Sequence, residues 1–74
     1  MTKSKYEINI ASVPDREQVV AEIWIGDVLF AELRREGTDV LVEMYPRPSG
    51  EPWVVESEWL SGIMLEAKSK LLGQ

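Results

Sequence analysis

Apolar and polar side chains alternate along the first half of the chain with the period of β-strands. Every second position of residues 6–11 is apolar, and residues 18–25 are rich in β-branched and aromatic side chains. Residues 28–35 and 39–45 continue this pattern. Successive side chains of a strand point to opposite faces of its sheet, so a half-buried strand has a period of two. The pattern therefore predicts four strands.

Short segments between these strands carry turn signals. Pro14 and Asp15 follow the first strand. Gly26-Asp27 separates the second and third strands, and a glycine at the first central position favours a type II′ hairpin turn. Glu36-Gly37 is the expected loop of the next hairpin. We therefore predict an antiparallel meander.

The end of the chain has helical spacing. Ser57 is the predicted N-cap, Glu58 favours the positive end of the helix dipole, and Gly73 is the expected end of the helix. Gly62 lies inside the helix and is expected to allow close approach to the sheet. One continuous apolar stripe contains Leu60, Ile63, Met64, Ala67 and Leu71.

Together these signals predict an α+β fold, a four-stranded antiparallel meander with one C-terminal helix packed on one face. We expect a single domain of residues 1–74, with the sheet at about 5–46 and the helix at about 57–72. The proline-rich segment 46–52 is the expected corner between them.

Two-residue hairpin loops would sort the sheet residues into two faces. Such loops place Ile25 opposite Val28 and Ile23 opposite Phe30. The first face, expected to lie under the helix, then contains Val20, Trp24, Leu29, Ala31, Leu33, Val40, Val42 and Met44, with Glu22 as the exception. The second face contains Ala21, Ile23, Ile25, Val28, Phe30, Leu41 and Tyr45, with Glu32, Arg34, Asp39 and Glu43 between them.

No further element is available to cover the second face, so it is a candidate interface. Its predicted residues are Ile23, Ile25, Val28, Phe30, Leu41 and Tyr45, with Glu32, Asp39 and Glu43 at the rim. The expected partner is a second copy of the chain, because a twofold-symmetric patch needs only self-complementarity, or else a basic protein. Two alternatives remain open. One is a register error of one residue, and the other is a coiled sheet partly covered by the first strand or by residues 46–52.

The composition further limits the kinds of catalytic and binding site that we expect in this chain. The chain of 74 residues has a net charge of −5 and contains no cysteine and no histidine. Most zinc sites and the usual nucleophile–base pairs need those residues, and nucleic-acid binding needs a clustered basic surface. Glu32 and Glu43 share a face, but no sugar-binding cleft is indicated for paired carboxylates. We therefore expect no enzyme, cofactor, metal, nucleic acid or membrane partner, and a cytoplasmic location.

The phrase "VEMYPRPSGEPWVV" followed by an amphipathic helix is similar to uncharacterised bacterial single-domain proteins. The layout of a sheet and then a helix, in a small acidic chain, resembles bacterial immunity and antitoxin domains. That resemblance implies that the acidic side chains would help to bind a basic toxin. Two other functions remain open: a ligand-binding module with a pocket lined by Trp24, Met44 and Trp59, and a structural subunit that binds only itself.

Overall fold

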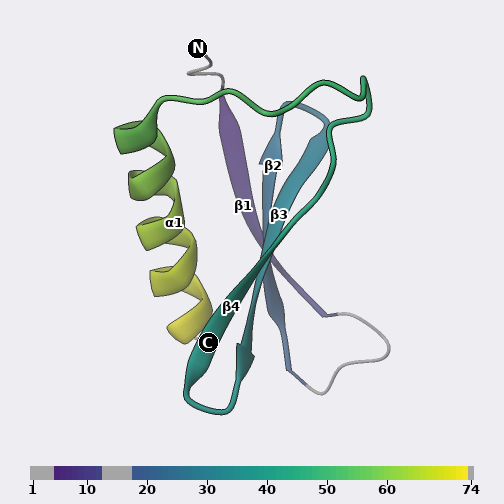
Figure 1. Ribbon diagram of the computed structural model, residues 1–74. Helices are drawn as coiled ribbons and strands as arrows, with labels where there is room; N and C mark the ends of the chain where they lie inside the picture. Colours follow the sequence, from purple (N-terminus) through teal and green to yellow (C-terminus); the bar gives the residue numbers. More distant parts are fainter. Residues whose placement is uncertain (1–4, 13–17, 74) are drawn as a thin grey trace.

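The computed structural model describes residues 5–12 and 18–73, which form a four-stranded antiparallel sheet and one helix (Figure 1). The strands follow one another in the order β1-β2-β3-β4, so β1 and β4 are the edges. This confirms the predicted α+β meander, whereas the predicted Pro14-Asp15 turn lies outside the described residues. The elements are β1 Tyr6–Ala11, β2 Val20–Ile25, β3 Val28–Glu36, β4 Asp39–Met44 and α1 Ser57–Leu72.

The hairpin between β2 and β3 begins as predicted and then departs from the expected register. Ile25 pairs with Val28, and Gly26 has a φ of 64°, the positive value that a type II′ turn requires at this position. Farther along, Ile23 pairs with Ala31 instead of Phe30. Phe30 is therefore an extra residue in β3, which makes a β-bulge.

The bulge corrects the predicted faces of the sheet. Phe30 and Ala31 are neighbours in sequence, yet both are buried in the core with Ile23. Beyond the bulge, Leu33 pairs with Ala21 and joins the same face. The two apolar sets that an unbroken alternation places on opposite faces therefore lie together under the helix.

The second hairpin also differs from the prediction, without changing the faces. Glu36 pairs with Asp39, so the loop is Gly37-Thr38 instead of Glu36-Gly37. Gly37 has a φ of 65°, which favours glycine. The register of β4 moves by two residues, and a shift of two keeps every side chain on its predicted face.

Helix α1 lies across β1, β2 and β3 (Figure 1). Its N-cap is Glu56, and Ser57 is the first helical residue, which corrects the predicted cap. The longer Glu56 side chain reaches the backbone N–H groups of Trp59, at 2.8 Å, and Glu58, at 3.1 Å. The predicted apolar stripe is confirmed, with Ile63, Ala67 and Leu71 buried and Leu60 and Met64 packed against them.

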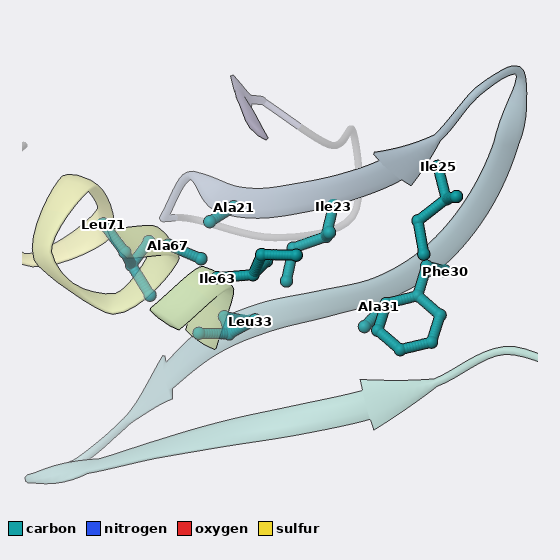
Figure 2. Packing of buried hydrophobic residues seen from close by; sticks show 9 residues of the cluster. All are labelled: Ala21, Ile23, Ile25, Phe30, Ala31, Leu33, Ile63, Ala67 and Leu71. Carbon is teal, nitrogen blue, oxygen red and sulfur yellow. The ribbon is translucent and has the colours of Figure 1, made fainter. Parts of the chain in front are cut away.

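The core lies between the helix and the sheet. In Figure 2 the side chains of Ile23 and Leu33 lie beside Ile63 of the helix, whereas those of Ile25 and Phe30 lie next to each other, farther from the helix. The buried cluster contains Ala21, Ile23, Ile25, Phe30, Ala31, Leu33, Ile63, Ala67 and Leu71.

The segment between β4 and α1 is fixed to this core by Trp53. Its ring edge packs on Phe30 with centroids 5.0 Å apart, and its Nε1 donates to the carbonyl oxygen of Tyr45 at 3.0 Å. The guanidinium of Arg47 lies 5.4 Å from the centroid of the same ring. The proline-rich segment lies between β4 and α1 and carries the chain from the sheet to the helix.

Replacing Phe30 with alanine is expected to unfold most of the protein. Phe30 is 1% exposed, and a buried Phe→Ala change costs about 3–5 kcal/mol, a large part of the stability of a small domain. Leu41→Ala, on the exposed side of β4, is the matched control and should cost less than about 1 kcal/mol. Urea unfolding followed by tryptophan fluorescence measures both. Equal losses would contradict the described core.

Replacing Gly62 with alanine is expected to stabilise the protein by about 1 kcal/mol. Gly62 is exposed, and a Cβ placed there meets no atom within 4 Å, so the prediction that it allows close packing on the sheet is wrong. Alanine then gains helix propensity without a clash. The urea midpoint should rise at an unchanged m-value, and a fall would show that the helix needs glycine here.

Candidate functional site

The residues predicted to form an open apolar face do not share one surface. Ile23, Ile25 and Phe30 are buried in the core, so their predicted exposure is wrong, and the bulge is the physical reason. Val28 is half-buried beside the first hairpin turn.

The other predicted residues lie on the face of the sheet away from the helix or at its edge. Leu41, Glu43 and Asp39 are exposed there, Tyr45 is half-buried, and Glu32 is 6% exposed. Whether any of them contacts a partner stays a prediction.

A network of ion pairs covers the middle of the face away from the helix. The guanidinium of Arg34 lies 2.7 Å from a carboxylate oxygen of Glu43, 3.1 Å from Glu36 and 3.5 Å from Glu32. The hydroxyl of Tyr45 donates to Glu32 at 3.4 Å. This face is therefore polar at its centre.

The pKa of Arg34 is raised above its ordinary value, first by its hydrogen bond with Glu36 and then by its hydrogen bond with Glu43. Arg34 is thus a permanent cation that holds two strands together. Among residues 5–12 and 18–73, no cluster of acidic side chains is arranged to hold a metal ion. The network supports a structural role for these carboxylates.

The open feature of the sheet is the outer edge of β4. Every residue of this strand except Val40 is exposed. Val42 and Met44 lie on the helix side and are 44% and 50% exposed, and Leu41 on the other side is 38% exposed. A helix about 10 Å wide covers two to three strands spaced about 4.8 Å apart, so apolar side chains of the fourth strand remain in solvent.

The backbone N–H and C=O groups of β4 alternate along the strand, pointing toward β3 at one residue and away from β3 at the next. Tyr45 donates its N–H to the carbonyl oxygen of Phe30 at 3.0 Å, directly after the strand. In an antiparallel ladder, hydrogen-bonding groups turn toward the neighbour at every second residue. The groups of Val40, Val42 and Met44 therefore point away from β3, into the space beside the sheet.

The opposite edge, β1, is partly covered. The Tyr6 hydroxyl donates to Glu66 of the helix at 2.7 Å, and the Tyr6 ring packs edge-on against Trp59 with centroids 6.0 Å apart. Ile8 and Ile10 of β1 pack against the core. The two edges thus differ, and β4 offers more exposed apolar surface.

The hydrogen bond between Tyr6 and Glu66 changes the pKa values of both groups. It is the main cause that lowers the pKa of Glu66 and raises the pKa of Tyr6. Lys70, 3.4 Å from Glu66, lowers the pKa of Glu66 further.

The residues of the alternative ligand pocket are not brought together. Trp24 pairs with Glu7 and Leu29, and its Nε1 donates to Glu22 at 3.2 Å on the face away from the helix. Met44 lies at the β4 edge, and Trp59 packs beside Tyr6. A hollow of about 410 Å³ lies elsewhere, lined by Gln18, Val19, Arg35 and Leu71.

Comparisons with protein-family models, curated proteins and solved structures found no match. Within the part of the chain that the structure describes, no helix has the length and hydrophobicity needed to cross a bilayer.

We expect Tyr6→Phe to raise the pKa of Glu66. In the wild type that pKa lies below 4.5, so the stabilising contribution of Glu66 is present above this pH and is lost as the pH falls through the lower, native value. Carboxyl chemical shifts recorded by NMR during an acid titration measure the change. An unchanged Glu66 titration in Tyr6→Phe would contradict the stated role of this hydrogen bond.

Proposed function

We propose that this chain is a protein-interaction domain that binds an extended segment of a partner as an additional strand beside β4. The observation that carries this proposal is the outward direction of the backbone groups of Val40, Val42 and Met44 on an exposed strand. Main-chain hydrogen bonds supply affinity in such complexes, and alternate side chains supply selectivity.

The β4 edge lacks the usual protection against strand addition. Native edge strands are commonly interrupted by proline, lysine or a bulge, or are covered by another element. Residues 39–44 contain neither proline nor lysine, and they pair with β3 without a register shift. Glu43 is an acid on this strand, but its carboxylate is bound to Arg34. The edge is therefore open to an apolar strand.

The proposal also uses the acidic charge of the chain. Asp39 is exposed beside the edge, and the chain carries a net charge of −5. Charge complementarity raises the association rate of a basic segment more than its final affinity. A short peptide with lysine at both ends is therefore a suitable probe for this edge.

Val42→Pro is expected to abolish strand addition and leave the fold intact. Proline removes an N–H that points away from β3, so the ladder within the sheet keeps its bonds. The probe is a short synthetic peptide of alternating threonine and valine with lysine at both ends, and the readout is amide hydrogen exchange by NMR. At a protein concentration low enough for the chain to be monomeric, the peptide should slow exchange at Val40, Val42 and Met44 in the wild type.

Val42→Thr keeps the N–H and is the matched control, which should bind the peptide. The outward amides of β1, including Ile8, should not respond. Absence of protection at millimolar peptide, or equal protection in Val42→Pro, would contradict strand addition at β4.

A further inference from the structure

The part of the β4 edge that is available for strand pairing extends equally far on both sides of Val42. Val40, Val42 and Met44 have outward backbone groups, and the turn residue Thr38 precedes them. The next outward position after Met44 is Pro46, which has no N–H to donate. The open ladder is therefore bounded on both sides at equal distance from Val42.

We propose that the strand bound beside β4 is β4 of a second copy of this chain, antiparallel, with the twofold axis at Val42. This inference rests on the proposed function and names its partner. Val42 of one copy pairs with Val42 of the other, and Val40 pairs with Met44 in both directions. The backbone N–H and C=O groups of all these residues point away from β3, so each pair can exchange two backbone hydrogen bonds.

Repulsion between acidic side chains favours this register over the two adjacent registers. A twofold axis perpendicular to the sheet keeps each face on its own side, so the register changes in steps of two residues. One step toward the turn places Asp39 opposite Glu43 of the second copy, and one step toward Met44 places Glu43 opposite itself. Like charges directly opposite each other destabilise a pair.

The register centred on Val42 avoids both contacts. It places Leu41 opposite Glu43 of the second copy, and Asp39 opposite Tyr45. The acids of the two strands are thereby separated.

The same register gathers the exposed apolar side chains. Val40, Val42 and Met44 share the helix side of the sheet, so the pairing joins their two copies in one stripe. Val42 and Met44 are 44% and 50% exposed in the single chain. The stripe continues the helix-side core across the twofold axis, which extends the small core of each copy.

Sedimentation equilibrium of the wild type, Val42→Lys and Leu41→Lys tests the pairing. The wild type should be a dimer, and Val42→Lys should be monomeric because two lysines then lie directly opposite each other. Leu41→Lys should remain a dimer because its lysine meets Glu43 of the second copy. Both sites are exposed, and circular dichroism checks the fold. Dissociation of Leu41→Lys but not of Val42→Lys would overturn this register.

Single cysteines locate the axis directly, because the natural chain contains no cysteine. Two Val42→Cys residues would have Cα atoms about 5.5 Å apart, within disulfide range, and should cross-link on mild oxidation. Two Leu41→Cys residues would lie about 7–8 Å apart and should not. Cross-linking through residue 41 in preference to residue 42 would contradict the proposed axis.

The two proposals fail in different ways. A wild type that is monomeric at every soluble concentration, with β4 amides still protected by the lysine-flanked peptide, would overturn self-pairing and leave strand addition standing. A monomer whose β4 amides do not respond to the peptide would overturn both.

Discussion

The β-bulge at Phe30 determines how this small chain forms one core. Without the extra residue, Ala31 and Leu33 would share a face with Trp24, and Ile23 and Ala21 would lie on the opposite side. The bulge turns Ala31 and Leu33 onto the side of Ile23, so both apolar sets lie under one helix. In the part of the chain that the structure describes, one helix covers one face of the sheet, and the bulge gathers the core side chains of β2 and β3 on that face.

The bulge at Phe30 also places the charged residues of neighbouring strands on the same face of the sheet. Glu22 and Trp24 of β2 lie on the face that carries Glu32, Arg34 and Glu43 of β3 and β4. Arg34 bonds to carboxylates on its own strand and on β4, so the polar face is tied across strands. Glu32 is nearly buried there, and its contacts with Arg34 and the Tyr45 hydroxyl offset the cost of removing a carboxylate from water.

The sequence was sufficient to predict the elements and their order, because strand alternation, the Gly26-Asp27 turn and the helical stripe are local patterns. It was insufficient to predict on which face of the sheet each side chain lies. Nothing in the amino-acid sequence around Phe30 distinguishes a bulge from a regular strand, because the residues on both sides of Phe30 are apolar. The predicted open face failed for that reason. Leu41, Glu43 and Asp39 do lie exposed, because β4 follows the bulge and kept its predicted face.

The open edge of β4 follows from the width of the helix and from the order of the strands. In a meander the last strand is necessarily an edge, and α1 lies over the other three strands. Covering β4 as well would need a second helix, and residues 5–12 and 18–73 form one. In the proposed pairing, a strand from outside would supply the missing neighbour without any new element in the chain. The exposed apolar residues of β4 are therefore what one helix over a four-stranded sheet leaves uncovered, and the proposed strand pairing would bury them without a second helix.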